Sequence, residues 1–401
     1  MPRVLYAAFD VVPSPKGAST HVAQFVSGLS GAGHEVTLVT PRAPGLPDEE
    51  PFAGARLLRV GTPGSGNFLF RALEFGEEVA RLAEHLGPFD IVHYRSLWGG
   101  LPLLLGGGAR RTVFEANSLS SVELPFHYPA LRGSPTLEKI RRLELRVLRE
   151  SDAVVCVSRV SRAYLATLGA DARRIEVIPN GVDPRAFAAT PLPARDGREP
   201  LALYVGTLAD WQGLATLVEA MPRVLAHRPL RLRIVGRGRS RQRKDLAKRV
   251  RRLGLEAQVD IVPPVPHHAV PALVAEADLC LAPLAYNERN VVQGCCPLKV
   301  LEYMAAGRPV VASNLPVVRE LAREERDALL VPPDAPDALA DAILRLLEDE
   351  RLARRLAGHA ARRARERFSW KRAQKRLLKL YSRLLAAPGE APGSGAPRPR
   401  A

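Results

Sequence analysis

The sequence predicts an α/β protein with two doubly wound, parallel-sheet domains of Rossmann-like type. Its length of 401 residues suits two domains better than one. Short, continuous apolar runs alternate with helical patterns along most of the chain, which indicates parallel strands covered by helices on both faces. One segment, residues 184–200, shows neither periodicity and is rich in Pro and Ala, so it is the expected linker.

Each half of the chain contributes six expected strands. Those of the first half begin at Val4, Glu35, Asp90, Thr112, Asp152 and Ile175. Those of the second half begin at Leu201, Leu232, Val259, Asp278, Arg308 and Ala328. We therefore expect an N-terminal domain over residues 1–185 and a C-terminal domain over residues 186–367. A helix over residues 368–385 should return to the N-terminal domain, and the Pro/Gly/Ala-rich tail over residues 386–401 should be disordered.

Composition narrows the functional classes. No apolar run reaches the roughly 18 residues of a membrane span, and the N-terminus lacks a signal-peptide pattern, so we expect a cytoplasmic protein. The four cysteines form no C-x-x-C pair and are expected to be buried thiols. The net charge of +16 reflects either an arginine-rich composition or attraction to an anionic partner. Aromatic interleaving and recognition motifs are absent, so nucleic acid is not the expected partner.

Ligands of open parallel sheets bind beyond the carboxyl ends of the strands. After the first strand, Gly17 opens a helix, and the backbone N–H groups of that turn could meet a phosphate. The turn contains neither G-x-G-x-x-G nor a P-loop, which disfavours nicotinamide and ATP binding. The sequence also lacks Asp-x-Asp, so we expect no metal.

The segment "CCPLKVLEYMAAGRPVVAS" beginning at Cys295 combines an anion site with a carboxylate. Cys296 could act as N-cap and Pro297 as the first helical residue, where its missing N–H costs nothing. The free N–H groups and the helix dipole would then favour an anion.

In the same helix, Lys299 lies in the first turn, which is unfavourable for a cation unless an anion neutralises the site. Glu302 follows at i+3 on the same face and could accept two hydrogen bonds from a vicinal diol such as ribose. A plain surface Lys–Glu pair has the same spacing, so spacing alone leaves both interpretations open.

Several motifs, in order, resemble those of family 4 glycosyltransferases, which have the GT-B fold of two Rossmann-like domains facing across a cleft. They cover the chain up to about Leu385: "KGASTHVAQFVSGLSGAGHEVTLVT", "DIVHYRS", "TVFEANSLSSVELPFHYP", "SDAVVCVS", "VIPNGVDPRAF", "LYVGTLADWQGLATLVEAM", "CCPLKVLEYMAAGRPVVAS" and "FSW". The resemblance implies a retaining transferase that moves a sugar from a nucleoside diphosphate sugar, UDP- or GDP-linked, to an acceptor hydroxyl. The donor would lie on the second domain and the acceptor mainly on the first.

The resemblance also implies site residues. Glu302 would hold the ribose, and Lys299 would face the diphosphate and sugar. The other donor-binding positions are Gly17, Gly294, Cys295 and Cys296 at the phosphates and sugar, Pro264 and Val265 beside the base, and Gly206 and Thr207 at the border of the phosphate pocket.

This sequence departs from the family pattern at three donor positions. Gly294 replaces a glutamate, and Thr207 and Gln212 replace the usual Arg and Lys. The diphosphate charge would then fall on Lys299, with Arg289, Arg237 or Arg159 as candidate helpers. Where many relatives carry an acceptor-side histidine, the candidates here are Glu115 and Asn117, and a satisfied polar pair at the end of a strand is the alternative interpretation of the two. His93, His267 and His268 are expected to be structural or solvated.

Two alternatives and several partners remain open at this point. The alternatives are a GT-B sugar-nucleotide epimerase and a non-catalytic basic binding protein. The family analogy points to surface polysaccharide or glycolipid assembly, with a carbohydrate or lipid-linked acceptor. The basic helix expected over residues 138–150, with Phe126 and Tyr128 before it, suggests docking on an anionic membrane surface at its inner face.

Overall fold

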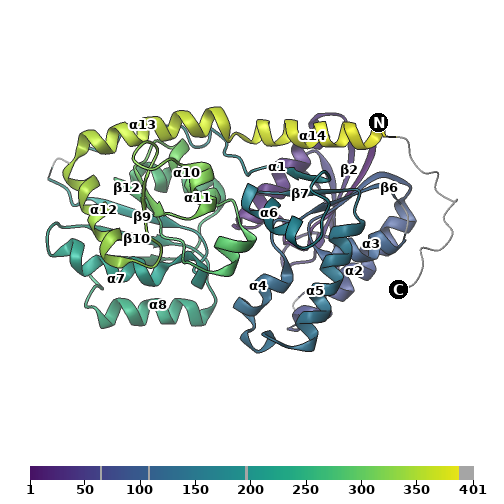
Figure 1. Cartoon of the computed structure of the whole chain (residues 1–401), viewed down its shortest axis with the longest axis horizontal. Coiled ribbons are helices and arrows are strands. Elements are labelled where there is room, and N and C mark those ends of the chain that lie inside the picture. The colour runs from purple at the N-terminus through teal and green to yellow at the C-terminus, as the bar shows by residue number, and fades with distance from the viewer. Residues whose placement is uncertain (64–65, 107–108, 195–196, 388–401) are drawn as a thin grey trace.

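The computed structural model describes residues 1–63, 66–106, 109–194 and 197–387, and these form two lobes joined side by side (Figure 1). Each lobe contains one sheet. The strand order is β3-β4-β2-β1-β5-β6-β7-β8 in the N-terminal lobe and β11-β10-β9-β12-β13-β14 in the C-terminal lobe. Neighbouring strands are parallel, except for the antiparallel pair β3 and β4 at one edge. The prediction of two parallel-sheet α/β domains is confirmed.

The N-terminal lobe has the six expected strands and two more. Its strands are β1 (Arg3–Ala7), β2 (Glu35–Pro41), β3 (Glu49–Phe52), β4 (Ala55–Val60), β5 (Phe89–Tyr94), β6 (Ala109–Glu115), β7 (Ala153–Cys156) and β8 (Ile175–Val177). Its helices are α1 (Gly17–Gly31), α2 (Phe68–Leu86), α3 (Leu97–Gly106), α4 (Ser120–His127), η1 (Pro129–Leu131), α5 (Pro135–Glu150) and α6 (Arg159–Thr167).

The two additional strands, β3 and β4, were missed because neither is a continuous apolar run. Charged residues interrupt both, and one of them, Arg59, is fully buried. Its guanidinium donates to the carbonyl of Val12 at 2.9 Å and pairs with Glu50 of β3. A buried cation of this kind is tolerated because its donors are satisfied, and the sequence pattern does not report that pairing.

All six strands predicted for the C-terminal lobe are confirmed. They are β9 (Leu201–Val205), β10 (Arg231–Val235), β11 (Val259–Val262), β12 (Leu279–Ala282), β13 (Val310–Ser313) and β14 (Leu329–Val331). The helices are η2 (Asp210–Gln212), α7 (Leu214–Leu225), α8 (Ser240–Arg252), η3 (His267–Ala269), α9 (Val270–Glu276), η4 (Arg289–Gln293), α10 (Leu298–Ala305), α11 (Pro316–Leu321), α12 (Pro336–Glu348), α13 (Glu350–Arg367) and α14 (Trp370–Ala386).

The last helix crosses back to the first lobe. Figure 1 shows α13 over the C-terminal lobe and α14 continuing over the N-terminal lobe. Gln374 of α14 donates to the carbonyl of Gln24 in α1 at 2.7 Å, and Tyr381 Oη lies 2.8 Å from His93 Nδ1 of β5. Ala386 is the final residue of α14, and residues 388–401 of the tail lie outside the described residues.

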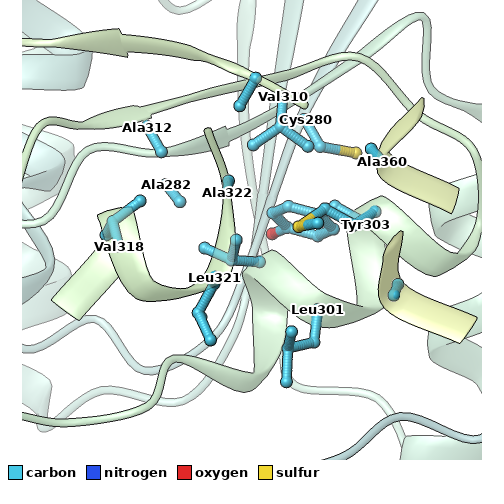
Figure 2. Packing of buried hydrophobic residues seen from close by; sticks show 14 of the residues in the cluster. Cys280, Ala282, Leu301, Tyr303, Val310, Ala312, Val318, Leu321, Ala322 and Ala360 are labelled. Carbon is cyan, nitrogen blue, oxygen red and sulfur yellow. The ribbon is translucent and has the colours of Figure 1, made fainter. Parts of the chain in front are cut away.

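Helix α10 is held by the core of the C-terminal lobe. Every residue from Lys299 to Ala305 is buried. Figure 2 shows Tyr303 of this helix near the small side chains of Cys280 in β12 and Ala360 in α13, and Leu301 belongs to the same core cluster. Small residues let the helix approach the sheet closely, so its start is placed rigidly at the carboxyl ends of the strands. All four cysteines are free and buried, as predicted.

Candidate active site between the lobes

A cleft of about 860 Å³ lies between the lobes and is lined by residues of both. Its wall is formed largely by the loops that follow β1 and β5 of one sheet and β9 and β10 of the other, together with the starts of α1 and α10. This is the carboxyl-end location predicted for a ligand site in open parallel sheets.

Two helix N-termini meet across this cleft. A Cβ built on Gly17, the first residue of α1, would lie only 2.8 Å from Leu298 Cδ1, the first residue of α10. Glycine therefore allows this close approach, and two sets of free N–H groups and two helix dipoles converge from opposite lobes. The predicted start of α10 was one residue early: Pro297, with an extended ψ of 106°, is the N-cap, so Cys296 is not.

Lys299 is buried at this meeting point. Its Nζ donates to Tyr204 Oη at 2.8 Å and to Gln212 Oε1 at 2.5 Å, and lies 3.9 Å above the Tyr204 ring. Burial lowers the pKa of Lys299 to about 7, although the nearby charge of Glu302 favours the charged form. The surface-pair interpretation is wrong, because Lys299 and Glu302 are each only 8% exposed and both line the cleft.

Glu302 has a partner that sequence reasoning did not assign to the site. His267 Nε2 lies 2.9 Å from Glu302 Oε1, and both residues line the cleft. The hydrogen bond with Glu302 raises the pKa of His267, while partial burial opposes it. The available signal was position, since His267 follows β11 at the carboxyl end of the sheet. Its neighbour His268 is exposed, and His93 is buried in the N-terminal lobe.

Most of the expected donor-side residues are brought together. Gly206, Thr207, Gln212, Arg237, Cys295 and Cys296 all line the cleft with Lys299 and Glu302. Gly206 has a φ of 155°, and a Cβ built there would lie 2.8 Å from Lys299 Nζ. Gln212 Nε2 donates to Thr207 Oγ1 at 3.4 Å. The two neutral residues that replace the family's cations are therefore linked to each other, and Gln212 also holds Lys299.

Three of the expected donor-binding residues do not line the cleft. Gly294 has a φ of 81°, and a Cβ there would lie 2.8 Å from the backbone nitrogen of Ser161 in α6, so it serves contact between the lobes. Pro264 is exposed on the loop after β11, and Val265 packs against the core of the C-terminal lobe. The motifs that predicted these three positions are present in the sequence, but the fold places the residues outside the cleft lining.

Glu115, one of two candidates for the acceptor side, lies behind the cleft wall with no exposed surface, which agrees with the alternative of a satisfied polar pair. It accepts from Arg95 at 2.5 Å and lies 2.9 Å from His21 Nε2. Burial favours its protonated form, but the charges of His21 and Arg95 outweigh this effect and hold the pKa of Glu115 well below its usual value. Asn117 does line the cleft, and it donates to Glu115.

His21 of α1 lines the cleft and was also missed, although it belongs to the first glycine-loop motif. Its Nδ1 lies 2.7 Å from Asn180 Oδ1, and Asn180 Nδ2 donates to the Cys296 carbonyl at 2.7 Å. That second bond orients the amide so that its oxygen faces His21, which therefore carries a proton on Nδ1. A polar chain thus runs from Glu115 through His21 to the start of α10.

A second connection between the lobes involves α4, which lies near α8 of the opposite lobe in Figure 1. Arg289 pairs with Glu123 at 2.8 Å and lies 4.9 Å above the Trp211 ring. Arg289 is therefore engaged with a carboxylate. Of the other two candidate helpers, Arg237 lines the cleft and Arg159 does not. We name the pair of Arg289 and Glu123 the inter-lobe clasp.

The two aromatic residues that precede the expected membrane-docking helix, Phe126 and Tyr128, lie at the end of α4. The rings of Phe126 and Trp211 lie 5.6 Å apart, and Tyr128 lines the cleft beneath Arg239, whose guanidinium is 5.1 Å from the ring. Phe126 thus packs against Trp211 and Tyr128 against Arg239, both in the opposite lobe, and each aromatic side chain is half-buried. Among the described residues, no helix is both long enough and apolar enough to cross a membrane.

Comparisons with known proteins assign the chain to a family. The model described as "Glycosyltransferase Family 4" matches residues 15–186, and that described as "Glycosyl transferases group 1" matches residues 199–349. A phosphatidyl-myo-inositol mannosyltransferase of Mycolicibacterium smegmatis is 31% identical over 412 residues, covering 97% of this chain and 95% of the relative. The chain belongs to glycosyltransferase family 4. It is a glycosyltransferase enzyme.

Solved structures place this glycosyltransferase in the GT-B fold. A sucrose-phosphate synthase of Thermosynechococcus elongatus has a TM-score of 0.80 and 25% identity, covering 97% of this chain and 100% of that one. Anabaena HepE, solved in complex with UDP and glucose, has a TM-score of 0.76 and 17% identity, covering 96% and 100%. The predicted fold and transfer activity are confirmed, and the comparisons give no support to the epimerase or non-catalytic alternatives.

In this glycosyltransferase, the cleft brings together groups suited to a leaving diphosphate. Two helix N-termini and the buried ammonium group of Lys299 direct positive charge toward one point of the cleft. Because these groups are already oriented, little reorganisation is needed when negative charge develops on a leaving group there. Glu302 lies one turn further along α10 and also lines the cleft.

Proposed function

We propose that the protein is a metal-independent, retaining hexosyltransferase. It takes a sugar from a UDP- or GDP-linked donor and adds it to a hydroxyl of a carbohydrate or lipid-linked acceptor, in the assembly of surface polysaccharide or glycolipid. The observation that carries the proposal is the convergence of the α1 and α10 N-termini on the buried Lys299. Burying that amine at the positive ends of two helices has an unfavourable free energy, and only a strongly anionic ligand offsets it.

The proposed reaction assigns a role to each end of α10. Glu302, oriented by His267, accepts hydrogen bonds from the ribose diol, and Lys299 with the helix N–H groups holds the diphosphate. When the bond from the sugar to the phosphate oxygen breaks, its electron pair passes to the nucleoside diphosphate. The acceptor oxygen attacks the same face of the sugar, and its proton passes to the departing phosphate, so the anomeric configuration is retained.

The choice of donor and acceptor is supported by the relatives. Anabaena HepE is described in complex with UDP and glucose, which favours a uridine donor. The mycobacterial relative is named for mannosyl transfer to phosphatidyl-myo-inositol, which favours a lipid-linked acceptor. Metal independence is supported by the position of Lys299, whose ammonium can neutralise the leaving diphosphate without a divalent ion.

A thermal-shift screen of UDP and GDP sugars, with and without EDTA, tests the proposal. A donor at about 100 times its Kd should stabilise the protein by roughly 2.7 kcal/mol. The Glu302→Gln variant should lose most of this shift, whereas His268→Gln, an exposed neighbour of His267, should keep it. If no nucleotide sugar raises Tm, or if transfer requires added Mg²⁺ or Mn²⁺, the proposed donor site is refuted.

We also propose that the protein attaches peripherally to an anionic membrane at its inner face, where a lipid-linked acceptor would be found. Exposed apolar side chains support this idea on α2, at Phe70 and Leu73, and on α3, at Leu105. Each basic residue near such a surface contributes about 1 kcal/mol. Co-sedimentation with phosphatidylglycerol liposomes at 0.1 M salt, lost at 1 M, is the expected result, and a protein that stays in the supernatant at low salt would refute it.

A further inference from the structure

The N-terminal side of the cleft carries a connected group of aromatic rings that the donor does not need. The ring of Phe9 lies 5.1 Å from Phe75 and 5.7 Å from Phe68, and the ring of Phe68 lies 5.6 Å from Trp98 and 6.1 Å from Tyr128. All five residues line the cleft. We name these five residues the aromatic wall. Phe9, Phe68 and Tyr128 are half-buried and Phe75 and Trp98 are buried, so the wall is a packed apolar surface on this side of the cleft.

A cation of the N-terminal lobe, Arg71, lies beside the aromatic wall. Arg71 lies on α2 three residues after Phe68 and four before Phe75, so the three side chains share one face of the helix. Arg71 lines the cleft and is half-buried, and its Nε is shielded from solvent with no hydrogen-bond partner among the residues that the structure describes. No ion pair of its guanidinium is found within the described ranges. Its nearest sequence candidate, Glu74, instead accepts from the backbone nitrogen of Thr62 at 3.0 Å and from its hydroxyl.

The other arginines on this side of the cleft are neutralised. Arg42 donates to both carboxylate oxygens of Asp48, at 2.7 and 3.0 Å. Arg95 donates to Glu115 at 2.5 Å and to Asp10 at 3.1 Å. Partly buried charges are normally paired, because removing an ion from water is costly. Arg71 therefore presents an unused planar fork of donors, the geometry that matches an oxyanion in a bidentate manner.

We propose that Arg71 binds an oxyanion carried by the acceptor, a phosphate or a carboxylate, while the aromatic wall holds the ring or chain beside it. This inference rests on the proposed function for the requirement that the acceptor also presents a hydroxyl to the donor sugar. It adds that the acceptor is anionic, which neither the transfer chemistry nor the donor site demands. In this proposal, the charge of the acceptor is recognised by Arg71 of α2, in the lobe opposite α10.

The test compares acceptors that differ only in charge. Glucose, glucose 6-phosphate and glucuronate serve as soluble probes, and vesicles of phosphatidylglycerol against phosphatidylcholine form the lipid arm. Binding is measured by calorimetry with the protein saturated in the nucleotide chosen by the donor screen, so that phosphate cannot occupy the donor site. Transfer is measured as kcat/KM for each acceptor. The soluble and lipid arms separate a free oxyanion from a lipid phosphodiester as the source.

Matched variants isolate Arg71. Arg71→Gln should reduce the preference for the anionic over the neutral acceptor roughly 10- to 100-fold, since it removes charged hydrogen bonds. Arg71→Lys should lose part of that preference, because it keeps the charge without the fork. Arg81→Gln provides the control, because Arg81 lies on the same helix, exposed and paired with Glu78 at 2.9 Å, outside the cleft. Nucleotide affinity and Tm should be unchanged in all three variants.

The outcomes separate the two proposals. If the wild-type protein binds no nucleotide, the proposed function fails. If nucleotide binds but charged and neutral acceptors behave alike in both arms, the inference about Arg71 fails alone. It fails equally if Arg71→Gln and Arg81→Gln lose the anionic preference to the same extent.

Discussion

Replacing Lys299 with methionine should make the protein more stable and less active. The pKa of Lys299 falls from an ordinary value of 10.5 to about 7, a difference of about 3.5 units. At about 1.4 kcal/mol per unit, keeping the amine in this environment costs roughly 5 kcal/mol below pH 7, and about 4 kcal/mol at pH 7, where it is half-protonated. Methionine has a similar length and removes that cost.

Part of the gain is lost with the contacts of the amine. The variant gives up the hydrogen bonds to Tyr204 and Gln212 and the contact with the Tyr204 ring, each worth about 1 kcal/mol. We expect a net stabilisation of about 1–2 kcal/mol at pH 7, measured by denaturant unfolding. Donor affinity and kcat should both fall, because the variant lacks the cation that neutralises the leaving diphosphate.

The dependence on pH gives the sharpest check. Because the pKa of Lys299 is lower in the folded protein, the unfolded chain binds more protons between pH 7 and 10.5. The cost is fully present below pH 7 and disappears as pH rises through this window, so the advantage of Lys299→Met should shrink toward pH 10. Lys248→Met, at an exposed position of α8, is the control and should change neither stability nor activity. A destabilised Lys299→Met variant with unchanged donor affinity would refute the reasoning.

Glu302→Gln should weaken donor binding by roughly 1.5–3 kcal/mol with little change in Tm, and calorimetry showing full affinity would remove its role at the ribose. Glu123→Gln should break the inter-lobe clasp with Arg289, raising KM severalfold and enlarging the radius of gyration in small-angle scattering; identical values would show that the clasp does not govern closure. Burial raises the pKa of Glu144 to about 7, so the folded protein binds one more proton than the unfolded chain between pH 4.5 and 7 and loses stability as pH rises through that window. Glu144→Gln should flatten this dependence of Tm on pH, and an unchanged dependence would contradict the argument. Proton NMR of the first-formed product should show a retained anomeric configuration, and inversion would exclude the proposed mechanism.

The sequence alone predicted the two parallel-sheet domains, because continuous apolar runs report strands buried on both faces. It also located the start of α10 to within one residue and placed Lys299 and Glu302 on one face, since those features depend on local chain geometry. The strands β3 and β4 escaped notice because their stability depends on pairs such as Arg59 with Glu50, which form only when the sheet is assembled.

Tertiary structure alone decided the environment of each candidate. Local spacing could not distinguish an exposed Lys–Glu pair from the buried residues found here, because burial depends on both lobes and on the core beneath α10. It could not predict that Glu115 lies behind His21. Nor could it predict that Arg71, unlike neighbouring arginines, has no carboxylate partner in the part of the chain that the structure describes. The physical reason is that desolvation and pairing are set by groups distant along the chain, and these two effects determine whether a charged side chain supports the fold or remains free to bind a ligand.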